Sequence, residues 1–129
     1  GMSDSHGVVV SNHDRYLWAL DRHANVAEII DLQSGKWVNT VNLVGSVSDD
    51  PAPDLVHPAP NGNRFFVALR GPVPSSGDPH NAQGTTPGLG IIEVTDGGRS
   101  GSLLAPIALH WSLNGLGALA AALVWHLAT

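Results

Sequence analysis

Histidines are the residues of this sequence whose chemistry first suggests a functional site. They lie at His6, His13, His23, His57, His80, His110 and His126. Zinc sites often draw two ligands from a short spacing such as H-x-x-x-H or H-E-x-x-H, and neither spacing occurs here. We therefore predict no metal site. We interpret most histidines as turn and surface residues, and His57 with Asp54 as a pair that could bind a ligand.

A second polar group lies in the segment 71–88, GPVPSSGDPHNAQGTTPG, which is rich in glycine and proline. Loops on rigid β scaffolds often hold binding residues. The same composition is typical of a variable surface loop, and both interpretations remain open. The ligand-binding candidates are therefore Asp54, His57, Asp78, His80 and Asn81.

An acidic group at Asp49, Asp50 and Asp54 supplies oxygen atoms that could bind Ca²⁺. The Asp-x-Asp-x-Asp-Gly spacing of a calcium loop is absent, so we interpret this segment as a solvated connector. No G-x-S-x-G elbow, P-loop or G-x-G-x-x-G fingerprint occurs either. The sequence therefore predicts no catalytic residue and no cofactor.

The composition narrows the classes of partner and chemistry. The chain has 129 residues, no cysteine and a formal net charge of −5. Disulfides, thiolate metal sites and cysteine nucleophiles are excluded. A net negative charge gives no electrostatic reason to expect binding to nucleic acid or to an anionic membrane.

The elements that would position these residues are short strands. In the first half of the chain, apolar and β-branched runs alternate with turn residues, which predicts four strands. Their approximate positions are 8–11, 16–20, 26–32 and 37–43. Gly35, in the turn before the last of them, suits a positive φ.

The pattern then restarts with runs at 54–57, 64–69, 91–94 and 103–109. Residues 15–20 match residues 64–69 in character at an offset of 49, and residues 29–32 match 91–94 at an offset of 62. The difference between the two offsets predicts an insertion within the second unit. Four strands with short turns in each unit match the blades of a β-propeller. The sequence therefore predicts a mainly β protein of about two four-stranded antiparallel blades.

The last segment differs in composition from the rest of the chain, because residues 100–129 contain no Lys, Arg, Asp or Glu. Residues 112–128 follow helical spacing, which predicts an apolar C-terminal helix. It is shorter than the roughly 20 residues that span a bilayer, so a membrane role is not expected. Its apolar surface predicts an oligomer interface formed by Leu116, Leu119, Ala120, Leu123, Val124 and Leu127.

The stretch DLVHPAPNGNRFFVAL at 54–69 resembles the repeat of YVTN-type bacterial β-propellers. Pro53–Asp54 matches the pair that opens the inner strand, the residues at 60–63 match the turn before the aromatic strand, and those at 31–36 match the turn before the last strand. The resemblance covers residues 7 to about 100. It implies a fold shared by surface-layer proteins, lactonase-like enzymes and haem d1 domains, many of them periplasmic or on the cell surface. Its motifs are turn signatures, so it assigns no catalytic residue.

A closed propeller needs at least about four blades, and two are predicted here. We therefore expect a fragment of a larger propeller, and a homo-oligomer that covers its apolar flanks and open strand edges. The expected function is a non-catalytic module for self-association and protein or ligand binding. The alternative is a lactonase-like hydrolase with its site in a channel formed by the oligomer.

The predicted organisation has four parts. We expect a disordered segment at 1–6, a first blade at 7–44, a second blade at 45–110 with its insertion at 71–88, and the helix at 111–129. The first residues, GMSDSHG, show no basic segment followed by an apolar run, so we expect no signal peptide.

Overall fold

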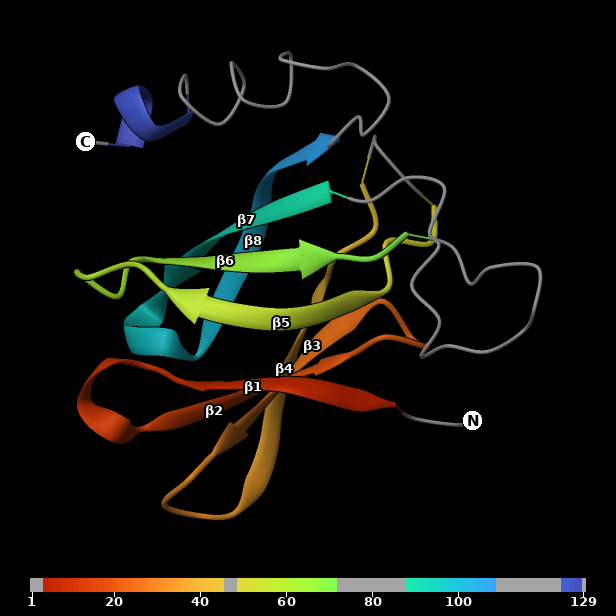
Figure 1. Cartoon of the computed structure of the whole chain (residues 1–129). Coiled ribbons are helices and arrows are strands. Elements are labelled where there is room, and N and C mark those ends of the chain that lie inside the picture. The colour runs from red at the N-terminus through yellow and green to blue at the C-terminus, as the bar shows by residue number, and fades with distance from the viewer. Residues whose placement is uncertain (1–3, 46–48, 72–87, 109–123, 129) are drawn as a thin grey trace.

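The computed structural model describes residues 4–45, 49–71, 88–108 and 124–128, with backbone alone at 105–108. Two four-stranded antiparallel sheets make up the fold, in strand orders β1-β2-β3-β4 and β5-β6-β7-β8 (Figure 1). A short helix at 124–128 follows them. The predicted fold class is therefore confirmed.

Each sheet is a simple up-and-down meander. The first sheet holds β1 (Ser5–Val10), β2 (Tyr16–Asp21), β3 (Val26–Asp31) and β4 (Lys36–Asn42). The second holds β5 (Pro53–Pro58), β6 (Arg64–Leu69), β7 (Gly88–Thr95) and β8 (Ser100–Ala108). Two short 3₁₀ turns, η1 (Asn12–Asp14) and η2 (Asp96–Gly98), lie between β1 and β2 and between β7 and β8.

The turn chemistry follows the sequence. Gly35 lies between β3 and β4 with φ of +67°, as its position predicted, and Gly62 lies between β5 and β6 with φ of +71°. Asn25 takes φ of +60° between β2 and β3. Asparagine tolerates this left-handed region better than most residues with a side chain.

The two sheets repeat each other with an offset that corrects the sequence alignment. Ser11 N–H donates to Tyr16 O at the first hairpin, and Ala59 N–H donates to Arg64 O at the equivalent hairpin of the second sheet. Tyr16 therefore corresponds to Arg64, an offset of 48 and not 49. The pairs Tyr16–Asp31 and Arg64–Glu93 keep the predicted offset of 62 for the third strands.

A matching irregularity supports this alignment. The register between β3 and β4 shifts between Ile29 and Ile30, and that between β7 and β8 shifts between Ile91 and Ile92. The two positions are equivalent at the offset of 62. The last strand of each sheet, β4 or β8, therefore has a bulge at the equivalent place. We call these two the outer strands.

The core lies between the two sheets. Trp18 of β2 meets Phe65 of β6 edge to face, with ring centroids 5.1 Å apart. Trp18 Nε1–H donates to Gly98 O at 2.7 Å, so its polar atom is satisfied while the side chain is fully buried. The other members of this core are Leu20, Ala27, Ile29, Val41, Leu43, Val67, Leu69 and Ile92.

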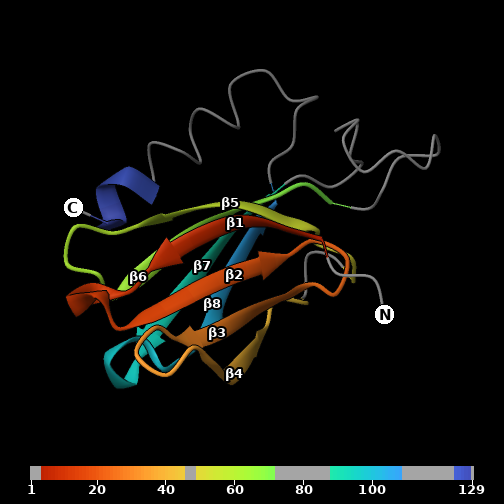
Figure 2. The same ribbon diagram turned by 90° about the horizontal axis from the view of Figure 1, so that it is seen from below.

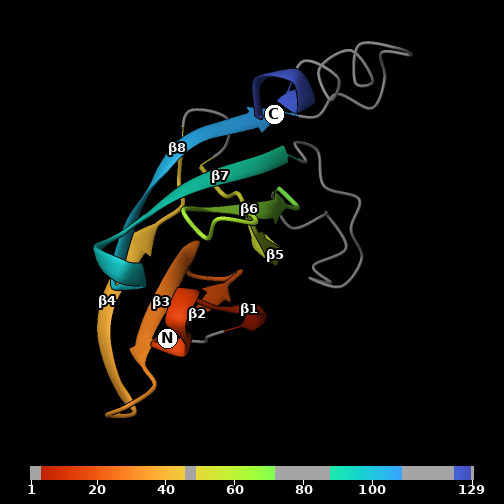
Figure 3. The ribbon, with the colours of Figure 1, turned by 90° about the vertical axis from the view of Figure 1, so that its left-hand side faces the viewer.

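The sheets stack with equivalent strands adjacent. β1 lies beside β5 at one side of the stack, and β4 lies beside β8 at the other (Figures 2 and 3). β1 and β5 are thus the first strands of two neighbouring blades, and we call them the inner strands. Gly7 allows their close approach, because a Cβ there would lie 1.9 Å from Asp54 O.

Several predicted boundaries can be compared with these elements. β1 begins at Ser5, so the first sheet starts two residues before the predicted boundary at residue 7. Residues 72–87 of the insertion, and 109–123 with most of the predicted helix, lie outside the described residues. Among those described, no helix has the length and hydropathy needed to cross a membrane.

Gly7→Ala tests the contact between the inner strands. We expect a loss of about 1–3 kcal/mol in the free energy of unfolding, because the new methyl group must push β1 away from the backbone of β5. Urea denaturation would measure it. Gly90→Ala is the matched control, because a Cβ there meets only side-chain atoms at 3.5 Å or more. Equal stability of the two variants would contradict the close approach.

Candidate functional site

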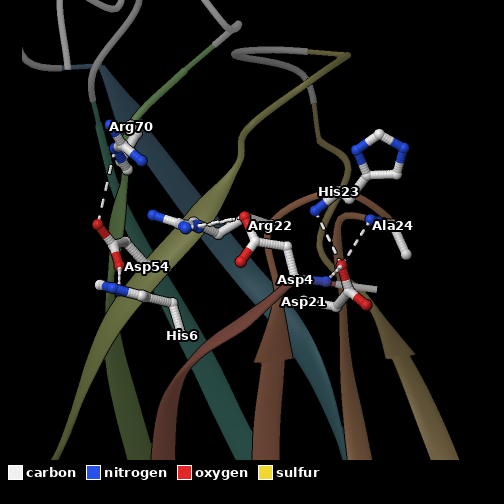
Figure 4. A network of polar contacts seen from close by, with 8 residues as sticks. All are labelled: Asp4, His6, Asp21, Arg22, His23, Ala24, Asp54 and Arg70. Carbon is white, nitrogen blue, oxygen red and sulfur yellow. Dashed lines mark hydrogen bonds and ion pairs between the residues drawn. The ribbon is translucent and has the colours of Figure 1, made fainter. Parts of the chain in front are cut away.

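A cluster of charged side chains lies at one end of the inner strands (Figure 4). Asp4 precedes β1, Arg22 follows β2, Asp54 belongs to β5 and Arg70 follows β6. His6 of β1 joins them. Antiparallel pairing brings the beginning of each first strand next to the end of each second strand, so the fold places these residues together.

The two arginines occupy equivalent positions. Arg22 N–H donates to Asp4 O at 3.0 Å, and Arg70 N–H donates to Ala52 O at 3.2 Å. Arg22 and Arg70 are separated by the same offset of 48 that relates the second strands. Both blades therefore repeat one arrangement, in which an arginine that follows the second strand pairs with a carboxylate at or near the first strand.

The first of these pairs is almost enclosed. Arg22 Nε and Nη2 both donate to Asp4 Oδ2, at 3.0 and 2.8 Å. The Arg22 side chain is only 4% exposed, whereas that of Asp4 is 38% exposed. A guanidinium so far from water needs a nearby anion, and Asp4 supplies it.

Asp54 joins the two sheets. One carboxylate oxygen contacts Nδ1 of His6 in the first sheet, and the other lies 3.6 Å from Nε of Arg70 in the second. The Asp54 side chain is 18% exposed and that of His6 is 45% exposed. The Asp54 carboxylate thus bridges neighbouring blades, while the imidazole remains accessible to solvent.

Asp21, at the end of β2, fixes the adjacent turn. Its Oδ1 accepts hydrogen bonds from the backbone N–H groups of His23, Ala24 and Asp4 at 2.8, 2.9 and 3.3 Å. Burial alone would raise the pKa of this carboxyl group. The three N–H donors outweigh burial and hold the pKa of Asp21 below its usual value.

This arrangement is better suited to holding the blades than to holding a metal. Asp4, Asp21 and Asp54 each already accept a hydrogen bond or an ion pair from the protein. Among the described residues, no group of three or more His, Asp or Glu side chains could bind a metal ion. The exposed imidazole of His6 beside Asp54 is the part of the cluster that could exchange a proton with a ligand.

The predicted ligand residues separate in the structure. Asp54 belongs to the cluster, but its partners are His6 and Arg70. His57 is exposed on β5, and the described part of the chain gives it no hydrogen bond or ion pair. The candidates Asp78, His80 and Asn81 lie outside the described residues.

Sequence reasoning missed Arg22 and Arg70. The available signal was the recurrence of arginine directly after an apolar strand, in ALDR at 19–22 and VALR at 67–70. An alignment at an offset of 49 places these arginines out of step and hides the recurrence.

Apolar surface is the second candidate for function, because each sheet has one buried and one outward-facing side. On the first sheet we define the first outward face as Val8, Val10, Leu17, Ala19, Ile30 and Trp37. Val8 and Trp37 are each 61% exposed, and Val10 is 42% exposed. Their neighbours along the strands, such as Val9 and Trp18, belong to or pack on the core.

On the second sheet we define the second outward face as Leu55, His57, Phe66, Ala68, Ile91 and Leu104. Leu55 is 64% exposed and Leu104 is 48% exposed. Phe66 pairs across the sheet with His57 and Ile91, so these three side chains share one side. Glu28 also lies on the first outward face, and Arg64 and Glu93 lie on the second. The stack thus has a mainly apolar surface on each of its two flanks.

The predicted interface residues Leu116, Leu119, Ala120 and Leu123 lie outside the described part of the chain. Val124 and Leu127 belong to the helix at 124–128. Val124 is partly buried there, and Leu127 is 80% exposed.

Comparisons with known proteins show which known fold this chain resembles. No family model and no curated protein matches the chain. It matches the crystal structure of a "putative 6-phosphogluconolactonase" from Bacteroides uniformis with a TM-score of 0.58 and 16% identity, over 86% of this chain and 28% of that one. A match to Kuenenia stuttgartiensis hydrazine synthase has 10% identity over 81% of this chain and 37% of that one, and its TM-score of 0.35 is too low to support an argument.

The likeness to the Bacteroides protein concerns the fold alone. At 16% identity it shows that the two sheets are arranged as in part of a propeller-like lactonase fold. The chain spans less than a third of that protein's length. The finer assignment to YVTN-type repeats stays a prediction.

Asp21→Asn tests the electrostatic part of the cluster. The pKa of Asp21 is lower in the folded chain than in the unfolded chain. The ionised carboxylate therefore stabilises the fold fully at pH values above the unfolded pKa, and this stabilisation is lost as the pH falls through the folded pKa. We expect the variant to lose about 1–2 kcal/mol of unfolding free energy at neutral pH. The difference from the native chain should shrink below about pH 4.

Chemical denaturation across this pH range would measure the effect. Asp14→Asn, at an exposed position in η1, is the matched control and should change stability little. A deficit in Asp21→Asn that does not change with pH would contradict the role given to the charge.

Proposed function

We propose that this chain is a non-catalytic β-propeller module whose function is to associate with further blades, supplied by other copies of itself. The observation on which this proposal rests is the mainly apolar character of both outward faces, which is interrupted by Glu28 on the first and by the paired Arg64 and Glu93 on the second. A two-layer sandwich places polar residues at the outward positions of its strands. Here Val8 and Val10 of β1, and Leu17 of β2, stand at those positions.

Packing requirements support the same conclusion. A sheet with apolar side chains on both sides needs a neighbour on each side. Among the residues that the structure describes, each sheet has one neighbour, which is the other sheet at the shared core around Trp18. The outward faces are left exposed at single side chains as large as Trp37, and such surfaces commonly mark interaction sites. Binding of other proteins or of ligands would be a further role of the assembled module.

A lactonase-like hydrolase is the second candidate, supported by one local observation. His6 and Asp54 form an imidazole–carboxylate pair at the end of the inner strands, with Arg70 beside it. Such a pair can act as a general base. Hydrolysis of a sugar lactone, lost in His6→Ala with the oligomer intact, would favour this candidate. A rate equal to that of His13→Ala, a histidine variant in η1, would count against it.

Self-association predicts a mass in solution above that of one chain. Sedimentation equilibrium of the native protein should give a multiple of 13.4 kDa. The midpoint of thermal unfolding should rise with protein concentration, because only the folded chains associate. A mass of 13.4 kDa at every concentration would overturn the proposal.

A further inference from the structure

We infer that the copies associate head to tail, with the second outward face of one copy packed on the first outward face of the next. The inference deepens the proposed self-association and rests on it. The interface between copies would repeat the interface that joins the two sheets within one chain. The corrected offset between the blades points to this arrangement.

The first outward face is equivalent to a surface that is already buried. At an offset of 48, Leu17 corresponds to Phe65 and Ala19 to Val67, and both counterparts lie in the core against the first sheet. Val8 likewise corresponds to Val56, which packs on that core. Through the matching bulge in the outer strands, Trp37 corresponds to Leu103, which also packs there. The first outward face thus has the pattern of a surface that receives a preceding blade.

The second outward face is equivalent to the opposite half of the same interface. Phe66 corresponds to Trp18 and Ala68 to Leu20, which are both fully buried against the second sheet. Ile91 corresponds to Ile29 at the offset of 62, and Leu104 corresponds to Val38. The second outward face thus has the pattern of a surface that receives a following blade.

The two exposed faces are therefore complementary to each other, and neither is complementary to itself. Within the chain, the first sheet meets the second through non-equivalent sides, so the blades are related by a rotation that can be repeated. A dimer joined through a single contact that lies on a two-fold axis would instead pair one face with itself. Repeating the rotation with whole copies gives a heterologous assembly, which closes into a ring when the rotation permits. Propellers of about four to eight blades correspond to about two to four copies.

One position makes the interface between copies differ from the one within the chain. Gly7 permits the close approach of β1 to β5, and its counterpart in the second sheet is Leu55, which is 64% exposed. A leucine cannot fit where a Cβ alone would meet backbone at 1.9 Å. The inner strands of neighbouring copies must therefore lie farther apart than β1 and β5 do.

Complementary charged variants test the head-to-tail arrangement. Val8→Asp places a charge in the first outward face, and Leu104→Asp places one in the second, both at exposed positions where folding should tolerate it. Each variant alone should lose the oligomer and sediment as a 13.4 kDa chain. Each also keeps one intact face, so an equal mixture should form a one-to-one heterodimer that cannot close or grow.

The matched control adds the same charge away from both faces. Gln33→Asp, in the exposed turn between β3 and β4, should keep the native mass. Circular dichroism of all three variants checks that they are folded, and Leu17→Asp with Phe66→Asp provides a second complementary pair.

The outcomes separate the two proposals. A native chain that is monomeric at every protein concentration overturns self-association itself. Its outward faces would then be surfaces for packing against blades of another polypeptide. A native oligomer that only one variant disrupts, with the other assembling normally, indicates a self-paired face and overturns the head-to-tail inference alone. An oligomer that survives both substitutions also overturns it.

Crosslinking gives an independent measurement, because the chain has no cysteine. Leu17→Cys and Phe66→Cys chains, treated separately with a short bifunctional maleimide, should remain uncrosslinked. A mixture should give a covalent dimer, because Leu17 and Phe66 are the counterparts of Phe65 and Trp18, which touch in the core. A covalent dimer from either variant alone would contradict the arrangement.

Discussion

Burial of Trp18 between the sheets is the interaction on which the rest of this structure depends. Its ring meets Phe65 edge to face, and its indole N–H reaches Gly98 O, so one side chain ties β2 to β6 and to the turn before β8. Gly101 leaves room for it, since a Cβ there would lie 2.7 Å from the indole. The two meanders thus share one core. Removing a buried aromatic of this size typically costs about 3–5 kcal/mol, a large part of the stability of a domain this small.

A single shared core has a consequence for both flanks. Each sheet buries one side against the other sheet, while the sequence makes both sides mainly apolar. Propellers resolve this requirement by placing a blade on each side of every other blade. In this chain Leu17 and Phe66 stand where such neighbours would pack. The likeness to about a quarter of a Bacteroides protein agrees with this description at the level of fold. The apolar flanks therefore agree with the blade pattern, in which each blade packs on a neighbour at both sides.

The polar cluster contributes in a different way. Arg22 and Arg70 stand at equivalent ends of the second strands, and each lies beside a carboxylate near a first strand. These pairs favour one arrangement of the inner strands, because a nearly buried guanidinium needs its anion close by. Asp54 extends the effect across the boundary between blades through His6. Apolar packing thus supplies most of the adhesion between the sheets, while the charges specify how the inner strands meet.

The sequence by itself determined the strands, their order and their turns, because Gly35, Asn61–Gly62 and the β-branched runs act locally. It could not determine the register of the repeat. The run from Tyr16 to Leu20 is continuously apolar, so it lacks the alternation that distinguishes an offset of 48 from one of 49. A shift of one residue turns every side chain to the other side of a sheet. Only the tertiary structure, through hydrogen bonds that close the hairpins, decided that Trp18 is buried while its counterpart Phe66 faces outward. It also decided that Asp54 pairs with His6 and Arg70 and not with His57, because contacts between strands so distant in sequence depend on how the sheets pack.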